Sequence, residues 1–108
     1  MDKLRAIQYL VAAVEAGSLA GAARQLDVSV PAVQKLIGAL EHTLGTTLLE
    51  RNAQGVRPTV AGGEYLDCCR PLLAELSAAE DAIKLAATRP SGTLAIAVHE
   101  QLAHHVLL

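Results

Sequence analysis

The chain has 108 residues, which is room for one small domain and a short extension. More than half of the residues are hydrophobic, yet only 2% are aromatic, and neither Trp nor Phe occurs. This composition favours packed helices with a core of Leu, Val, Ile and Ala over a β-sandwich or barrel. The formal net charge of −2 argues against a generic polyanion binder, because non-specific DNA affinity comes mostly from neutralised phosphates.

The charges are unevenly distributed along the chain. Up to Val60, six Lys and Arg residues stand against five Asp and Glu residues, whereas the remainder has three basic and six acidic residues. The first half is therefore mildly basic, and any attraction for DNA is expected to be modest and local.

The sequence carries no signal for export or membrane insertion. Charges interrupt the N-terminal residues, so no signal peptide is expected, and no stretch is long enough to span a membrane. Cys68 and Cys69 are adjacent and poorly placed for a disulfide, so we expect small apolar side chains on a helix. The expected location is the reducing cytoplasm, without a membrane partner.

Two helices are predicted first, and the second is the shorter one. Apolar residues recur at helical spacing from Leu4 until Gly17, which ends the first helix. Ser18 is expected to cap a second helix with a small inner face that includes Ala22 and Ala23. Residues 27–29 are expected to form a tight turn.

A third helix is predicted to begin after Ser29 and to end at Gly45. Pro31 falls in its first turn, where a missing N–H costs nothing. One apolar stripe is expected to be buried, and it contains Val33, Leu36, Ile37, Leu40 and Leu44. The opposite side carries Pro31, Lys35, Gly38 and His42.

A hairpin and a long helix are expected next. Two extended pieces near residues 48–51 and 56–59 flank an Asn-Ala-Gln-Gly turn. Thr59 or Val60 then begins a helix that reaches to about Ala87. Pro71 within it predicts a kink or an interruption, because proline removes a backbone hydrogen bond.

The C-terminal segment suggests a linker in RPSG and a buried strand in GTLAIAV. His99 and His104 invite a zinc interpretation, but five residues of separation put them on different faces of a helix. No catalytic constellation and no cofactor motif appears in the sequence. We expect neither an enzyme nor a metal site.

A helix-turn-helix is the functional hypothesis that these elements support. The pair consists of the two predicted helices on either side of the turn at residues 27–29. The second helix of a helix-turn-helix presents its N-terminal residues to base edges, while the rest of the unit contacts phosphates. Periodicity alone leaves open a three-helix bundle without any role in nucleic-acid binding.

The run from Leu4 to Gly62 resembles the N-terminal domain of LysR-type bacterial transcriptional regulators. The resemblance covers slightly more than half of the chain without a gap. The matching residues are AGSLAGAARQLDVSVPAV, then Ile37, Leu40, Glu41, Leu44 and Gly45, then LLER and TVAG.

The resemblance implies a mainly α fold. It is a winged helix-turn-helix of three helices and a two-stranded wing (residues 1–59), followed by a long dimerisation helix (residues 60–88). Residues 89–108 would be a linker and the first strand of a truncated effector-binding domain.

The resemblance also implies a DNA-binding set, in which the recognition helix enters the major groove. Val30 replaces the usual glutamine and offers only apolar contact, for instance to a thymine methyl group. Lys35 replaces an arginine and gives a point charge, and Gly38 lies where the family often has a basic residue. The implied DNA-binding residues are Ser29, Val30, Pro31, Gln34, Lys35, Gly38, Arg51, Arg57 and Thr59.

The wing residues have alternative roles. Arg51 is expected either to reach the minor groove or backbone or to fix the hairpin by an ion pair with Glu41 or Glu50. Arg57 is expected to contact a phosphate. Thr59 is a candidate cap of the long helix, whose first-turn N–H groups could hold a phosphate.

The implied partners are double-stranded DNA and a second copy of the chain, which would pair through the long helix. A full-length protein could also form a tetramer. A small-molecule effector would bind only the missing C-terminal domain. As an alternative to dimerisation, the apolar stripe of the long helix could pack on its own domain. As an alternative to a DNA-binding regulator, the chain could be an interaction module that dimerises but does not bind DNA tightly. The implied dimerisation residues are Leu66, Leu73, Leu76 and Ile83, with Glu80 as a polar interruption.

Overall fold

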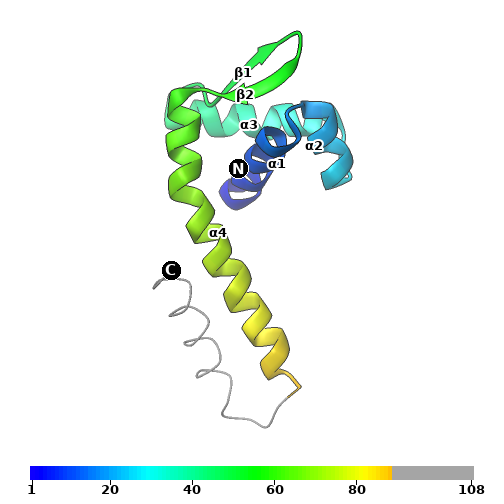
Figure 1. Cartoon of the computed structure of the whole chain (residues 1–108), viewed down its shortest axis with the longest axis vertical. Coiled ribbons are helices and arrows are strands. Elements are labelled where there is room, and N and C mark those ends of the chain that lie inside the picture. The colour runs from blue at the N-terminus through cyan, green and yellow to red at the C-terminus, as the bar shows by residue number, and fades with distance from the viewer. Residues whose placement is uncertain (89–108) are drawn as a thin grey trace. The chain divides into compact units, whose positions relative to one another are not determined.

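The computed structural model describes residues 1–88 (Figure 1). The chain divides into two compact units, Met1–Leu66 and Asp67–Leu108, and each is described by itself. The predicted linker RPSG, the strand GTLAIAV and the His99–His104 segment lie outside the described residues. The elements are α1 (Lys3–Ala16), α2 (Leu19–Leu26), α3 (Val30–Leu44), β1 (Leu49–Asn52), β2 (Gly55–Pro58) and α4 (Val60–Ala86).

The predicted N-caps are confirmed. The Ser18 hydroxyl accepts a hydrogen bond from the Gly21 amide at 2.9 Å, at the start of α2. The Ser29 hydroxyl accepts one from the Ala32 amide at 3.2 Å, at the start of α3. Each bond satisfies a backbone donor that has no partner within its helix. These caps explain why α2 and α3 begin where they do.

The helix ends also follow the prediction. Gly17 and Gly45 adopt the left-handed conformation after α1 and α3, with φ of 70° and 69°. Asp27 ends α2 in the same conformation, with φ of 57°. Since a short polar side chain tolerates this region better than most, Asp27 suits the tight turn between α2 and α3.

The core of the first unit lies between α1, α2 and α3. Its largest fully buried side chains are Leu10, Val33, Leu40 and Leu48. The predicted small residues of α2 are buried there, so that the helices can cross closely. One expectation was wrong: Leu44, at the end of the predicted buried stripe, is exposed, because α3 ends there. The buried alanines are Ala6, Ala12, Ala13, Ala22 and Ala23.

The wing is an antiparallel pair in which Leu49 faces Pro58 and Asn52 faces Gly55. Its strands begin and end within one residue of the predicted limits. Gly55 has a φ of +133°, and a Cβ there would collide with the Gly17 carbonyl oxygen. That same oxygen accepts a hydrogen bond from the Val56 amide at 3.0 Å. Gly55 is therefore required for β2 to lie against the turn between α1 and α2.

Helix α4 begins at a predicted residue and ends within one residue of the predicted limit. The Thr59 hydroxyl accepts a hydrogen bond from the Gly62 amide at 3.0 Å and caps the helix. The predicted interruption at Pro71 does not occur, since α4 is continuous from Val60 to Ala86. Both Pro71 and Asp67, whose carbonyl loses its helical donor, are exposed, so water can replace the lost bond.

Membrane insertion finds no support in the described helices. None of those within residues 1–88 combines the length and the apolar character needed to cross a bilayer.

Candidate nucleic-acid interface

The turn between α2 and α3 fixes the two helices as a helix-turn-helix (Figure 1). The Val28 amide donates back to the Ala23 carbonyl at 3.0 Å, and the Asp27 amide donates to the Arg24 carbonyl at 3.3 Å. Ser29 follows at once as the cap of α3. The start of α3 is therefore held by backbone bonds on one side and by its cap on the other.

The side of α3 opposite its buried face is open to solvent. Pro31, Lys35, Gly38 and His42, hereafter the outer stripe, are all exposed and recur at helical spacing. A Cβ added at Gly38 would meet no atom within 4 Å, so the backbone of α3 is uncovered there. Within the outer stripe, only Lys35 and His42 have long side chains.

The flanks of the outer stripe are partly covered. Val30 and Gln34 are half-buried, and Val30 packs against the core. Ser29 is exposed, and its hydroxyl oxygen serves the cap while its hydrogen stays available to donate. The predicted recognition residues of α3 are therefore brought together at the first turns of one helix.

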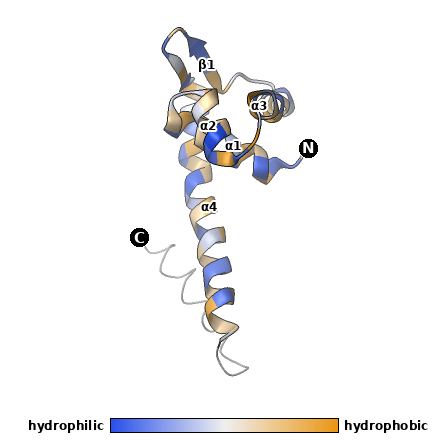
Figure 2. Ribbon diagram, turned by 90° about the vertical axis from the view of Figure 1, so that its right-hand side faces the viewer, coloured by the Kyte–Doolittle hydropathy of each residue, from blue (hydrophilic) through white to orange (hydrophobic). Residues whose placement is uncertain are grey.

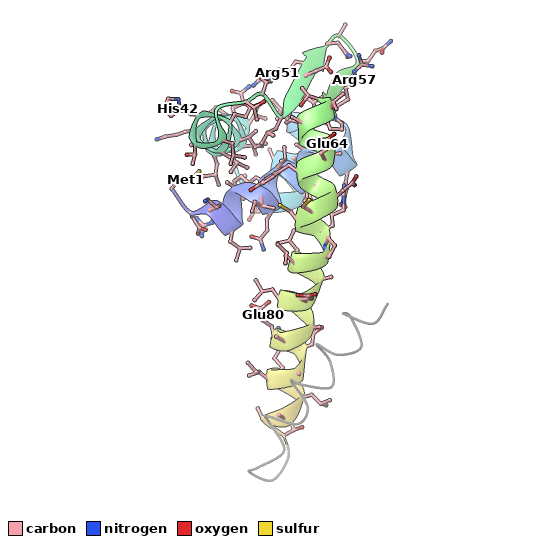
Figure 3. The ribbon with its side chains drawn as sticks, turned by 90° about the vertical axis from the view of Figure 1, so that its left-hand side faces the viewer. Met1, His42, Arg51, Arg57, Glu64 and Glu80 are labelled. Atoms are coloured by element: carbon pink, nitrogen blue, oxygen red, sulfur yellow. The ribbon has the colours of Figure 1, made fainter. Side chains whose placement is uncertain are left out.

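Positive charge on α3 is scarce. Lys35 is the sole Lys or Arg of this helix, and no ion pair of Lys35 occurs among the described residues. His42 lies in the last turn, on the same outer stripe (Figure 3). A single fixed cation is consistent with the modest electrostatics that the composition predicts.

Glu41 has a role that the sequence did not reveal. One carboxylate oxygen of Glu41, Oε2, accepts hydrogen bonds from the amides of Leu48 and Leu49, at 2.6 Å and 3.2 Å. The alternative ion pair with Arg51 is not formed. The only signal in the sequence was an acid on α3 seven residues before a buried leucine, and such a signal does not identify a backbone acceptor.

Of the two wing arginines, Arg57 and not Arg51 forms an ion pair with Glu50. Arg57 lies opposite Glu50 in the sheet register, and its Nη2 is 3.6 Å from a Glu50 carboxylate oxygen. Both side chains are largely exposed, at 68% and 48%, so the pair contributes little to stability. It nevertheless places a negative charge beside Arg57, which sequence reasoning had expected to face a phosphate.

Arg51 is the wing arginine without an acidic partner among the described residues. It is exposed, and no ion pair of Arg51 appears within residues 1–88. Since neighbouring residues of a strand point to opposite faces, Arg51 and the Glu50–Arg57 pair lie on different faces of the wing. In Figure 3, Arg51 is labelled on the side of the wing nearer α3 and Arg57 on the other side.

The side chain and the amide of Thr59 are used in hydrogen bonds within the unit. Besides capping α4, its hydroxyl donates to the Thr47 carbonyl at 2.7 Å, and its amide donates to the Leu48 carbonyl at 3.0 Å. The capping role is confirmed. Any phosphate at this position would have to be held by backbone amides of the first turn and not by the Thr59 side chain.

The predicted dimerisation residues fall into different environments. Leu66 is 2% exposed and belongs to the core of the first unit, so it is not available to a partner in this structure. Leu73 is half-buried. Leu76 and Ile83 are exposed at 39% and 51%, and Leu72 on the same face is exposed at 63%. Figure 2 shows hydrophobic residues recurring along α4 between hydrophilic ones.

The cysteines and acids of the described residues form no metal site. No group of three or more His, Cys, Asp or Glu residues that could hold a metal ion occurs within residues 1–88. Cys68 and Cys69 lie on a helix as expected, and both are free thiols, of which Cys69 is buried and Cys68 is exposed.

Known proteins with similar sequences and folds are bacterial regulators. The family described as "Bacterial regulatory helix-turn-helix protein, lysR family" matches residues 4–63. The HTH-type transcriptional regulator TcbR of Pseudomonas sp. is 37% identical over 95 residues. The match covers 88% of this chain and 32% of TcbR, so the chain spans about a third of that relative's length.

Two solved complexes with DNA share the fold. The structure of the CbnR DNA-binding domain with DNA has a TM-score of 0.67 and 40% identity, over 79% of this chain and 97% of that chain. The structure of the BenM DNA-binding domain with the catB site 1 DNA has a TM-score of 0.75 and 32% identity, over 83% and 100% of the two chains. With a family match over more than half of its residues, this chain belongs to the LysR family of bacterial regulatory helix-turn-helix proteins.

Proposed function

We propose that this chain is the DNA-binding part of a transcription regulator, with α3 in the major groove and the wing on the adjacent backbone or minor groove. The observation that carries the proposal is the outer stripe, which leaves one side of α3 uncovered on a capped helix-turn-helix. The similarity to DNA complexes of CbnR and BenM supports the same assignment. A regulator of this kind acts in the cytoplasm, where the chromosome lies.

The proposed division of labour on α3 follows from side-chain chemistry. Ser29 and Lys35 would contact phosphates, because a hydroxyl donor and an ammonium group suit anionic oxygens. Gln34 would read a base, since an amide can bridge to adenine. Val30 and Pro31 would offer apolar contact, and Gly38 would let the helix backbone approach closely.

In the wing we assign the DNA contact to Arg51 before Arg57. Arg51 has no acidic partner within the described residues, whereas Arg57 has Glu50 at 3.6 Å. A phosphate would have to compete with that carboxylate for Arg57. Both arginines stay in the proposed interface, but with unequal weight.

We further propose that α4 joins two copies of the chain. Leu72, Leu76 and Ile83, hereafter the α4 stripe, are exposed and share one face of the helix. Leu73 flanks this face, and Leu66 is excluded by its burial in the core. In a full-length protein, a C-terminal effector-binding domain would add the small-molecule response and could extend the dimer to a tetramer.

A titration of labelled duplex tests the proposal against the alternative of an interaction module without tight DNA binding. The duplex carries the sequence upstream of the protein's own gene, and a scrambled duplex serves as the control. Saturable binding at both of two salt concentrations supports DNA reading. The logarithm of the association constant should fall with the logarithm of the salt concentration, with a slope of about −0.9 per neutralised phosphate. Absence of binding at the lower salt concentration contradicts it and favours the interaction module.

A further inference from the structure

Several hydrogen bonds hold the wing and its base in place. β2 is held by the Val56 amide on the Gly17 carbonyl, and the base of β1 is held by the Leu48 carbonyl, which accepts from the Thr59 amide. Both of these bonds join backbone to backbone. The Thr59 hydroxyl adds a bond to the Thr47 carbonyl. The Glu41 carboxylate makes a further attachment, and it is the one that a side chain of α3 provides.

The Glu41 attachment lies where backbone donors need a partner. Leu48 is 1% exposed and precedes β1, so its amide would be costly to leave without an acceptor. A carboxylate oxygen that accepts from two amides makes charge-assisted bonds, which are about twice as strong as neutral ones. Glu41 itself is half-buried, which limits the access of water to these bonds.

Glu41 is also a neighbour of the proposed DNA contacts. It lies on α3 next to His42 of the outer stripe and beside the helix turn that carries Gly38. Its carboxylate accepts a hydrogen bond from the amide of Leu49, the first residue of β1, which lies two positions before Arg51. One side chain thus connects the helix that would enter the groove with the strand that would carry the wing cation.

We propose that Glu41 is a positioning residue that sets the distance between α3 and the wing, so that Lys35 and Arg51 reach the same duplex together. The inference rests on the proposed DNA-binding function. Glu41 contacts no base or phosphate in this proposal and acts through the amides of Leu48 and Leu49.

The sign of the effect on DNA affinity separates this role from simple electrostatics. Removing a negative charge near DNA should strengthen binding if charge alone matters. Loss of a positioning residue should weaken it. Glu41→Ala removes the acceptor, and Glu41→Gln keeps one neutral acceptor oxygen. Glu64→Gln is the matched control, since Glu64 is an exposed acid at the start of α4, in the same unit (Figure 3).

The first experiment measures amide hydrogen exchange in the free protein. Glu41→Ala should speed exchange at Leu48 and Leu49 and leave the amides of α1 unchanged, with a smaller increase for Glu41→Gln and none for Glu64→Gln. Equal protection of Leu48 and Leu49 in all four proteins would overturn the attachment. Because no DNA is present, this result does not depend on the proposed function.

The second experiment is a double-mutant cycle on the duplex that the wild type binds. Arg51→Ala should weaken wild-type binding by about fivefold, the scale of one screened charge contact. In the Glu41→Ala background the same change should cost less than about twofold, because Glu41 no longer fixes the distance between α3 and the wing, and in the Glu41→Gln background the cost should lie between these two values. The matched cycle with Lys35→Ala should be additive, since Lys35 stays on its helix.

The outcomes separate the two proposals. If the wild type fails to bind any duplex at low salt, the proposed function is wrong. If the wild type binds and the Arg51 effect is the same in every background, or if Glu41→Ala strengthens binding as Glu64→Gln does, only the positioning role is wrong. Glu41→Gln serves as the folded variant for the whole cycle if Glu41→Ala lowers the helical content.

Discussion

The helix-turn-helix unit and the helix that follows it expose different chemistry. In the unit Met1–Leu66, the outer stripe of α3 exposes a proline, a lysine, a glycine and a histidine to solvent. The opposite side of α3 packs on a core in which many of the buried residues are alanines. Beyond Leu66, the α4 stripe shows Leu72, Leu76 and Ile83 to solvent. An exposed stripe that carries a lysine and a histidine suits a nucleic acid, whereas an exposed apolar stripe suits a second protein surface. The molecule thus separates its two proposed partners between its two units.

The largest expected effect concerns the core beneath the outer stripe. Leu40→Ala should lower the free energy of unfolding of the first unit by about 2–5 kcal/mol, because Leu40 is fully buried and its loss leaves a cavity. Leu44→Ala, on the same helix but exposed, is the matched control and should cost less than about 1 kcal/mol. Denaturant unfolding followed by circular dichroism measures both. Similar losses for the two variants would contradict the placement of α3.

The next effect concerns the α4 stripe. Leu76→Glu should convert a dimer into a monomer, since a carboxylate would be buried between two apolar stripes without a partner. Lys84→Glu introduces the same side chain on the same helix outside the stripe and should leave the mass unchanged. Light scattering at several protein concentrations gives the answer. An unchanged mass for Leu76→Glu would show that another surface joins the copies.

A smaller effect is expected at Lys35, the sole fixed cation of the outer stripe. Lys35→Ala should weaken binding to all duplexes alike and reduce the slope of log K against log salt by about one. Lys3→Ala, at the start of α1 and also exposed, controls for the loss of a positive charge. A loss confined to one base pair of the operator would instead assign Lys35 to base reading.

The smallest effect on affinity, but the largest on selectivity, is expected at Gln34. Gln34→Ala should reduce discrimination at particular base pairs by about 1–3 kcal/mol while binding to scrambled duplex stays the same. Competition with single-base operator variants measures this. A uniform loss on every duplex, like that of Lys35→Ala, would contradict the separation of roles along α3.

Local chemistry explains what the sequence could predict. Caps such as Ser18 and Ser29 and stop residues such as Gly17 and Gly45 act through bonds to residues three or four positions away, and these positions are readable in one dimension. The order of helices, hairpin and long helix follows from such signals. The residues of the outer stripe followed from helical period alone.

Long-range contacts explain what the sequence could not predict. The Glu41 carboxylate reaches two amides seven and eight residues away, and the Glu50–Arg57 pair depends on the strand register. Periodicity also treated Leu66 as part of the dimer seam, although its side chain is taken up by the core of its own unit. These features arise from tertiary packing, which no local pattern records.

The most direct test of DNA reading by α3 is a map of amide chemical-shift changes as an operator duplex is added. If α3 and the wing bind DNA, the largest changes occur at residues 29–38, which are the cap and first turns of α3, and at residues 50–57 of the wing, with small changes along residues 67–86. Large changes confined to residues 67–86, or an unchanged spectrum at low salt, would contradict DNA reading by α3.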